Sequence, residues 1–269
     1  MLFRSALVSR FGRASQASLS YTWSKLLANT GLGNADGGIT AANVYTDSTQ
    51  PDLDYGRASV DKTHIFAGSL VLALPTLEDK SSFARNVFGD WEITSIVQAS
   101  SGYPITVYLG GVPGLSGSGS AAGTGYTNAQ RPNLADQPCR ASGGVETQWL
   151  NPAAWTINNY QIGTNGNSGR GICDGPGYFQ VDAAVYKNIR IGKKIKLQLR
   201  AEMFNVFNRT NFLVGDEVSR TWNAENVVFD TGNPATATRI ISATPSASFG
   251  QLTDSADNRQ AQFGIRLSF

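Results

Sequence analysis

The last segment of the chain alternates strictly between two kinds of side chain. From Arg259 to Phe269, every odd-numbered position after the first is apolar, and every even-numbered position is polar or glycine. Successive side chains of an extended strand point to opposite faces, so the pattern predicts a strand over 258–269 with one apolar face. A half-buried strand of a soluble protein gives the same pattern, so this segment alone leaves a soluble sheet and a membrane sheet both open.

Other segments also have the composition and alternation of strands. The clearest is 194–208, where the apolar positions from Ile195 to Met203 are odd and the polar positions between them are even. The predicted strands span 2–11, 14–27, 64–75, 90–109, 178–191, 194–208 and 258–269. Long helical periodicities are almost absent, which predicts an all-β, antiparallel fold of about six or seven strands.

The register of the predicted hairpin 178–208 follows from its apolar faces. If the odd residues of both strands share a face, the numbers of paired residues must sum to an even number. The predicted partners are Ile191 with Ile195, Ile189 with Leu197 and Tyr186 with Arg200. This pairing predicts a short turn or a bulge over Gly192-Lys193-Lys194.

The connections between the predicted strands alternate in length. Those at 28–63, 110–177 and 209–257 are long, and those at Gly12-Arg13, 76–89 and Gly192-Lys193-Lys194 are short. Loops above about 15 residues are uncommon in compact soluble domains. Outer-membrane barrels, in contrast, have short periplasmic turns and long extracellular loops. The connections therefore favour an up-and-down transmembrane β-barrel segment with its long loops outside the cell.

The composition agrees with a barrel and excludes other classes. No run approaches the roughly 20 apolar residues of a membrane helix, whereas a transmembrane strand needs only about 9–11. Charged residues make up 16% of the chain and the net charge is +2. Such a weak charge without a basic cluster argues against nucleic acid as a partner. The N-terminal apolar run is too short for a secretory signal, so we expect an exported protein to begin upstream of Met1.

Several segments, in order along nearly the whole chain, resemble Oar-like TonB-dependent outer-membrane receptors. The segment RAEMFNVFNRTNF (200–212) looks like their penultimate strand. The other similar segments are YTWSK (21–25), DKTHIFAGSLVLALP (61–75), SSGYPITV (100–107), ICDGPGYFQVDAAVYKNIRI (172–191) and SFGQLTDSADNRQAQFGIRLSF (248–269). The resemblance implies a large barrel in the bacterial outer membrane, filled by a separate N-terminal plug domain and energised through TonB for uptake of a solute.

The predicted strands are too few for such a barrel, because even the smallest closed outer-membrane barrels have about eight. We therefore expect residues 1–269 to be a C-terminal barrel part without the plug. By itself it should form an open, curved sheet with 258–269 at one edge, paired only with 194–208. The expected partners are membrane lipid, the missing strands and plug, the TonB complex through that plug, the barrel assembly machinery and an unidentified extracellular solute.

The resemblance assigns roles to the two faces of the last strands. The lipid-facing residues would be Leu197, Leu199, Phe263, Ile265 and Leu267. The residues facing the barrel lumen would be Asp182, Arg190, Arg200, Glu202, Gln262 and Arg266. Phe269 would be the terminal aromatic signal that the assembly machinery reads. Aromatic residues near strand ends suit the membrane interface, and these are Tyr21, Trp23, Trp91, Phe207, Phe212 and Phe269.

Two cysteines, Cys139 and Cys173, both lie in the long connection 110–177. Thiols outside the cell oxidise, so we expect a disulfide, with two free buried thiols as the alternative. In the same connection, Trp149, Trp155 and Tyr160, together with Tyr126, could contact an extracellular solute. These rings could equally attach the loop to its neighbours.

Catalytic and metal-binding signals are weak. His64 has Asp61 nearby in sequence, but no Gly-x-Ser-x-Gly segment places a nucleophile, so a structural role is favoured and no enzyme is expected. The glycine-rich segment 114–125 lacks the Lys-Ser/Thr of a phosphate loop, and 34–38 and 50–56 lack calcium-loop spacing, so we predict turns, a surface loop and no cofactor.

A second hypothesis is a secreted soluble β-sandwich that binds a ligand, such as a carbohydrate, through its loop tryptophans. This hypothesis requires the odd, apolar faces of the strands to be buried against a second sheet.

Overall fold

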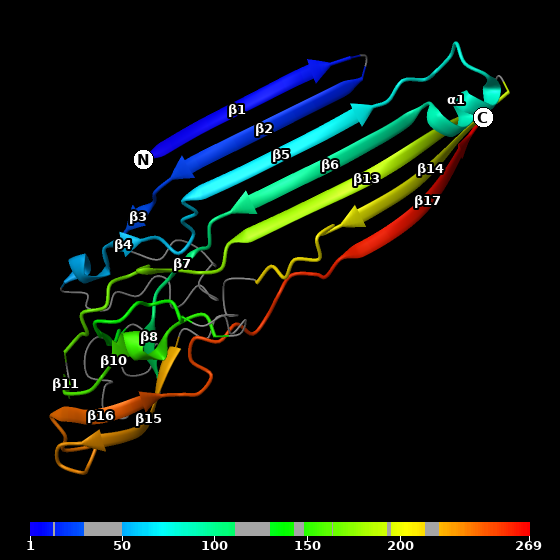
Figure 1. Cartoon of the computed structure of the whole chain (residues 1–269). Coiled ribbons are helices and arrows are strands. Elements are labelled where there is room, and N and C mark those ends of the chain that lie inside the picture. Colours follow the sequence, from blue (N-terminus) through cyan, green and yellow to red (C-terminus); the bar gives the residue numbers. More distant parts are fainter. Residues whose placement is uncertain are drawn as a thin grey trace.

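A computed structural model of the chain shows a long sheet with a smaller globular part at one end (Figure 1). The residues that the structure describes are 1–12, 14–29, 50–110, 130–142, 148–162, 164–192, 195–212 and 221–269. Five sites considered from the sequence therefore lie outside the described residues: Arg13, Lys193-Lys194, Tyr126 and the segments 34–38 and 114–125.

The sheet has seven strands in the order β1-β2-β5-β6-β13-β14-β17. Its neighbours are antiparallel throughout. The strands are β1 (Leu2–Phe11), β2 (Ser15–Ser24), β5 (His64–Ala73), β6 (Trp91–Ser100), β13 (Tyr178–Ile191), β14 (Ile195–Phe204) and β17 (Gln260–Ser268). The seven strands lie side by side in the order in which they follow one another along the chain, which confirms the predicted up-and-down, all-β arrangement.

The predicted hairpin register is confirmed. The pairs Ile191 with Ile195, Ile189 with Leu197 and Tyr186 with Arg200 all occur between β13 and β14. Glycine begins the tight turn because Gly192 has φ of 66°, a left-handed conformation that side chains with a Cβ rarely adopt. The strand bounds of 2–11 and 178–191 also match the prediction.

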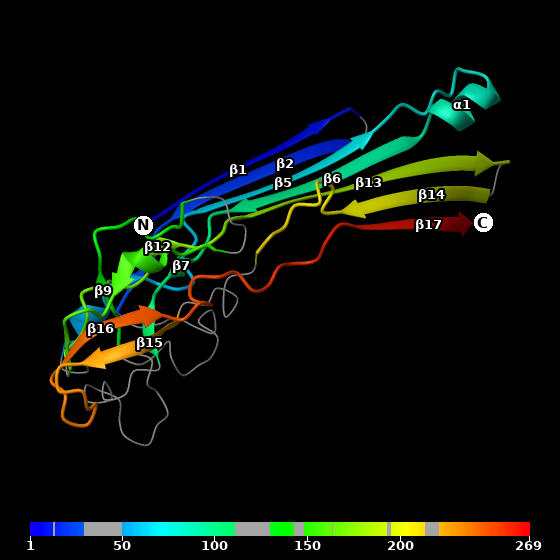
Figure 2. The same cartoon turned by 60° about the horizontal axis from the view of Figure 1, so that its bottom comes forward.

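The sheet is open and curved, as expected. Figure 2 shows the strands following an arc, with β1 and β17 at its two ends. β17 pairs only with β14, and β1 pairs only with β2. Both edge strands therefore leave one side of their backbone without a strand partner within the described residues.

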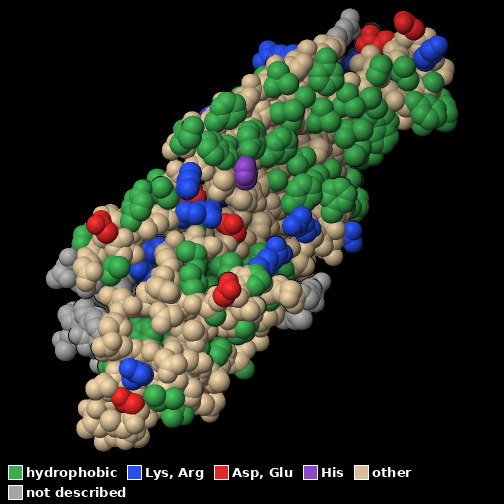
Figure 3. All heavy atoms as spheres, turned by 60° about the vertical axis from the view of Figure 1, so that its left-hand side comes forward, with side chains coloured by type: hydrophobic (Ala, Val, Ile, Leu, Met, Phe, Trp, Pro, Cys, Tyr) green, Lys and Arg blue, Asp and Glu red, His purple; other side chains and the backbone are tan. Residues whose placement is uncertain are grey.

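The pairing of the strands divides the sheet into two chemically different faces, because directly paired residues share a face. One face, here called the apolar face, carries Phe3, Leu7, Leu19, Phe66, Leu70, Val97, Val181, Val185, Leu197, Leu199, Phe263, Ile265 and Leu267. The opposite, polar face carries Arg4, Arg10, Ser18, Ser69, Gln98, Asp182, Arg190, Gln198, Arg200, Glu202, Gln262 and Arg266. Figure 3 shows hydrophobic side chains gathered over one side of the sheet.

The long connections fold together at one end of the sheet. We call the described residues between 101 and 177 and between 205 and 259 the loop module. It contains β7 (Pro104–Ile105), β8 (Tyr108–Gly110), β9 (Asn133–Leu134), β10 (Trp155–Thr156), β11 (Tyr160–Gln161), β12 (Cys173–Asp174), β15 (Thr221–Phe229), β16 (Arg239–Pro245) and the 3-10 helix Pro152–Ala154. The short pair β3 (Leu27–Ala28) with β4 (Gly56–Arg57) and the 3-10 helix Pro51–Asp54 lie in the remaining long connection.

Several predictions need correction, among them the strands predicted over 14–27 and 194–208, which are shorter, at Ser15–Ser24 and Ile195–Phe204. The strand predicted over 90–109 ends at Ser100, because Gly102 packs against the backbone of Gly175 and the chain then turns into the loop module. The connection 209–257, predicted as a loop, contains the hairpin β15–β16. The short link 76–89 contains the helix α1 (Ser82–Phe88), which begins where the Ser81 hydroxyl accepts a hydrogen bond from the Ala84 N–H.

Candidate functional site

The loop module has its own hydrophobic core, which is unusual for surface connections. Its largest buried apolar side chains are Trp222, Tyr160, Phe249, Leu150, Ile157, Ile240 and Val107. They come from segments far apart in sequence and form one cluster with Ile105, Leu109, Trp155 and Cys173. Burying a side chain of this size contributes about 1.5–3 kcal/mol, so the module is a folded unit.

A disulfide joins two segments of the loop module. Cys139 and Cys173 are bonded, with a sequence separation of 34 residues. Cys173 lies on β12, which pairs with β7 close to the end of the sheet. The bond therefore connects the segment around 139 to the chain that enters β13.

Two ion-pair networks attach the 50–61 segment to the loop module. The buried Arg131 guanidinium donates from Nη1 to Asp54 at 2.6 Å, from Nη2 to the Leu53 carbonyl at 2.6 Å and from Nε to the Ser168 carbonyl at 2.7 Å. Arg57 pairs with Asp61 at 3.1 Å and Asp174 at 2.5 Å. Partial burial alone would lower the pKa of Arg57, but these hydrogen bonds to carboxylates outweigh it and raise the pKa.

The segment RAEMFNVFNRTNF makes the exit from β14 into the loop module. Asn205 and Asn208 each have φ of 50°, a left-handed conformation that asparagine tolerates better than most residues. The Asn205 side chain accepts from Arg209 N and donates to the Arg209 carbonyl. Asn211 Oδ1 accepts from Phe179 N on β13 at 2.9 Å. These asparagines fix how the chain leaves the sheet.

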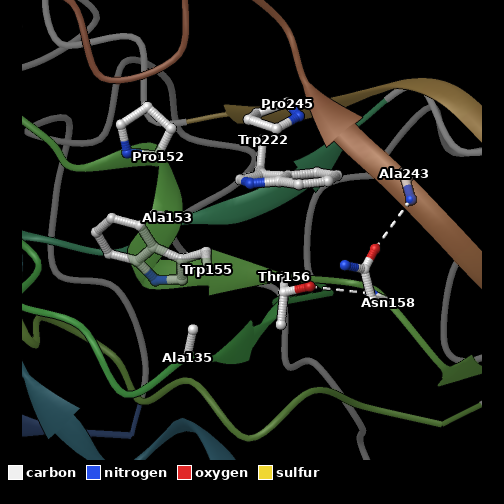
Figure 4. Close-up of a pocket in the computed structure, with 9 residues that line it drawn as sticks. All are labelled: Ala135, Pro152, Ala153, Trp155, Thr156, Asn158, Trp222, Ala243 and Pro245. Atoms are coloured by element: carbon white, nitrogen blue, oxygen red, sulfur yellow. Dashed lines mark hydrogen bonds between the residues drawn. The ribbon is translucent and has the colours of Figure 1, made fainter.

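A pocket of about 400 Å³ opens on the loop module between β10, β15 and β16 (Figure 4). It is lined by Ala135, Pro152, Ala153, Trp155, Thr156, Asn158, Trp222, Ala243 and Pro245, none of which is charged. The indole nitrogens of Trp155 and Trp222 are enclosed by protein atoms and have no hydrogen-bond partner among the described residues. Asn158 is fixed in place because its Oδ1 accepts from Ala243 N at 3.0 Å. The pocket therefore offers mainly apolar walls, formed by tryptophan rings, prolines and alanines.

The loop aromatics differ in their surroundings. Trp155 and Tyr160 are each 2% exposed and pack inside the module core, which agrees with the alternative that these rings attach the loop to its neighbours. Trp155 still borders the pocket. Burial raises the pKa of Tyr160 to about 12, and its hydroxyl donates to the Thr164 carbonyl at 2.9 Å. Trp149 is partly exposed, lies 4.1 Å from the Arg140 guanidinium and donates to the Asp174 carbonyl.

The residues assigned to the lumen and to lipid lie on opposite faces of the sheet. Asp182, Arg190, Arg200, Glu202, Gln262 and Arg266 are all on the polar face, and Leu197, Leu199, Phe263, Ile265 and Leu267 are all on the apolar face. On the polar face, Glu202 accepts hydrogen bonds from Tyr186 at 3.0 Å and from Gln262. Asp182 accepts from Gln180 and from Asn205 N. Phe269 follows β17 and is almost fully exposed.

His64 and Asp61 do not form a catalytic pair. His64 Nδ1 is 2.8 Å from the Tyr21 hydroxyl, while the Asp61 carboxylate accepts from Leu26 N and Arg57. The described residues contain no cluster of histidine, cysteine, aspartate or glutamate able to hold a metal ion. In the same part of the chain, none of the helices has the length and apolar character needed to cross a membrane.

Sequence reasoning missed two parts of this site. Trp222 and the buried Arg131–Asp54 pair were not predicted, because each depends on segments that meet only in the folded module. The hairpin that carries Trp222 did leave a signal, since TWNAENVVF and RIISATP flank the turn residues DTGNP.

Comparison with known proteins gives one match. The family model described as "Outer membrane beta barrel domain" matches residues 5–262, which run from within β1 to the beginning of β17. No curated protein and no solved structure matches the chain. The match agrees with a sheet that has one apolar and one polar face, and it places the protein in the bacterial outer membrane. This chain belongs to the outer membrane beta barrel domain family.

Proposed function

We propose that this chain is the C-terminal part of the barrel of a TonB-dependent receptor that binds and takes up an extracellular solute. The observation that carries the proposal is the separation of the connections: the long ones, including the loop module, gather at one end of the sheet, and the short ones lie at the other end (Figure 1). Outer-membrane barrels keep their long loops outside the cell, so the loop module would face the medium.

The two open edges support a larger barrel. β1 and β17 each have a strand neighbour on one side only, and an exposed edge strand invites aggregation unless it is paired. In the intact receptor, further strands would pair with both edges and close the barrel. Phe269, beside the β17 edge, would then be the residue that the barrel assembly machinery reads.

The two faces fit the two environments of a plugged barrel. The apolar face would meet membrane lipid, and the polar face, with Arg200, Glu202 and Asp182, would meet the plug domain in the lumen. Energy from the inner membrane would reach the receptor through the TonB complex and that plug.

The solute would bind at the loop module. The pocket bordered by Trp155 and Trp222 supports this placement, because it is a hollow in the loop module lined by two large aromatic side chains. Aromatic and apolar walls of this kind are typical of small-molecule sites. The lining has no charge, so it suits a neutral part of a solute.

The alternative of a secreted β-sandwich is not favoured. It requires a second sheet over the apolar face, yet Phe263 is 85% and Ile265 is 77% exposed there. The smaller sheets of the described chain are built from residues of the loop module and of the 27–57 connection, and none of them pairs with the long sheet.

Two experiments test the receptor proposal. Sequencing the reading frame upstream of Met1 should find an in-frame plug domain with a TonB-binding segment, and a signal peptide directly before Met1 would contradict the proposal. The purified periplasmic domain of TonB should bind the intact protein in phospholipid vesicles and lose this binding when the TonB-binding segment is deleted.

A third experiment tests the solute site. Cells producing the intact protein should deplete a solute from their medium, detected by mass spectrometry, and Trp222→Phe should reduce this depletion because it replaces a large aromatic wall of the pocket with a smaller ring. Trp149→Phe is the matched control, since Trp149 lies outside the pocket and should leave depletion unchanged.

A further inference from the structure

The helix α1 (Ser82–Phe88) is amphipathic, but its faces are reversed relative to a water-soluble surface helix. At 100° per residue, Phe83, Ala84, Val87 and Phe88 share one side, and Ser82, Arg85 and Asn86 share the other. Phe83 is 74% and Phe88 is 64% exposed, whereas Arg85 and Asn86 are partly buried. A helix that turns phenylalanine outward and arginine inward is not arranged for contact with water.

Two side chains hold α1 at the end of the apolar face. Trp91 on β6 and Lys187 on β13 are directly paired on that face, since Lys187 also pairs with Leu199. The Trp91 indole donates to the Val87 carbonyl at 2.9 Å. The Lys187 ammonium donates to the Gly89 carbonyl and lies 5.3 Å from the Trp91 ring centroid. These contacts join the backbone at the C-terminal end of α1 to the apolar face of the sheet.

The position of α1 suits the boundary of the membrane. It lies at the end of the sheet away from the loop module, the same end at which β17 reaches the C-terminus (Figures 1 and 2). Phe11 and Trp91 lie at the same end of strands β1 and β6, where a barrel places its aromatic belt. Phe83 and Phe88 extend that belt beyond the strands. Lys80, just before the helix, is exposed and suits a lipid phosphate.

We infer that α1 is an interfacial anchor that lies in the membrane plane and inserts Phe83 and Phe88 among phospholipid acyl chains. This contact follows from the apolar face, which family membership places in the outer membrane. The choice of the periplasmic leaflet rests on the barrel orientation in the proposed function.

Spin labelling of the intact protein, folded in vesicles of phosphatidylethanolamine and phosphatidylglycerol, tests the lipid contact. Single Phe83→Cys and Phe88→Cys variants would carry the nitroxide, with Asn86→Cys on the polar side as the matched control. Oxygen concentrates in the bilayer and a nickel chelate stays in water. We expect the ratio of oxygen to nickel accessibility at positions 83 and 88 to be several-fold higher than at position 86.

Two results would overturn the inference. An accessibility ratio at 83 and 88 no higher than at 86 would place the helix in water. Low accessibility to both reagents would mean that a second copy or another protein covers α1.

A separate measurement tests the leaflet. In intact cells, a maleimide on a large polyethylene glycol that cannot cross the outer membrane should label Ala235→Cys, at the exposed tip between β15 and β16, and leave Phe83→Cys unlabelled. Labelling at 83 together with none at 235 would overturn the periplasmic placement and the proposed barrel orientation, whereas the accessibility ratios test lipid contact independently of that orientation.

Discussion

Gly102 lies so close to Gly175 that a Cβ built on Gly102 would fall 1.9 Å from the Gly175 carbonyl oxygen. The two chains are joined there, because Gly175 N also donates to the Tyr103 carbonyl at 2.8 Å. The contact lies at the end of the sheet, where the chain runs from β6 into the loop module and later returns from the module into β13. It also explains why the segments SSGYP and DGPG both carry glycine at this point.

A methyl group at Gly102 should therefore destabilise the protein. Gly102→Ala must push apart two backbones rather than a mobile side chain, so we expect a loss of at least about 1–3 kcal/mol in the free energy of unfolding. Urea unfolding of the intact protein in phospholipid vesicles, followed by tryptophan fluorescence, measures it. Gly264→Ala is the control, because its Cβ would meet only Arg200 at 3.8 Å, and it should change stability by less than about 0.5 kcal/mol.

A charge placed on the apolar face should be costly. Leu199 lies near the middle of β14, between Lys187 and Ile265 in the neighbouring strands. Leu199→Arg should destabilise the folded protein in vesicles by about 2–4 kcal/mol if the face meets lipid. Gln198→Arg puts the same side chain on the polar face and should have a much smaller effect. Equal losses for the two variants would argue against the assignment of the faces.

The buried Arg131–Asp54 pair should matter far more than the exposed pair at the other end of the sheet. Arg131→Met leaves the Asp54 carboxylate buried without its guanidinium, which should cost about 3–5 kcal/mol. Arg190 and Glu78 are both more than half exposed and 3.6 Å apart, so Glu78→Gln should cost less than about 1 kcal/mol. Similar unfolding midpoints for both variants would show that the network does not hold the 50–61 segment.

The long strands could be predicted from the sequence because the two faces of each strand lie in different environments, one apolar and one polar. In β13, the alternation of Val181, Ala183 and Val185 with Gln180, Asp182 and Tyr186 fixes both the strand and its register. Period-two patterns need no long-range information. The faces of β14 and β17 follow in the same way from the alternation within each strand, and the open edge follows from the number of strands.

The loop module could not be predicted in the same way. Its core brings together Val107, Leu150, Trp222 and Phe249, whose spacing in sequence has no period. Several of its strands are only two residues long, so no alternation can develop. The burial of Trp155 and Tyr160 depends on partners from β15 and β16. The sequence pattern predicts only a long connection over these two strands.

Loss of the disulfide should destabilise the loop module. Cys139 and Cys173 close a segment of 34 residues, and in the chain-entropy description such a link stabilises by roughly 3–4 kcal/mol. A Cys139→Ser, Cys173→Ser double variant should therefore be cut faster by protease within 130–177, while the sheet keeps its resistance. Mass spectrometry without reduction tests whether the wild-type protein contains the disulfide, because the peptides that carry Cys139 and Cys173 should then remain linked.

Alkaline pH should weaken the protein through Tyr160. The pKa of this phenol is about 12 in the folded protein and about 10 in an unfolded chain, because burial disfavours the phenolate. Between these two pH values the unfolded chain loses the proton and the folded chain keeps it, so the stability linked to this group is full below about pH 10 and falls as pH rises toward 12.

The free energy of unfolding of Tyr160→Phe should therefore fall less steeply over this range than that of the wild type. Tyr55→Phe, which removes a phenol that is 61% exposed, should keep the wild-type slope. A Tyr160→Phe slope equal to that of the wild type would show that Tyr160 does not cause the alkaline loss.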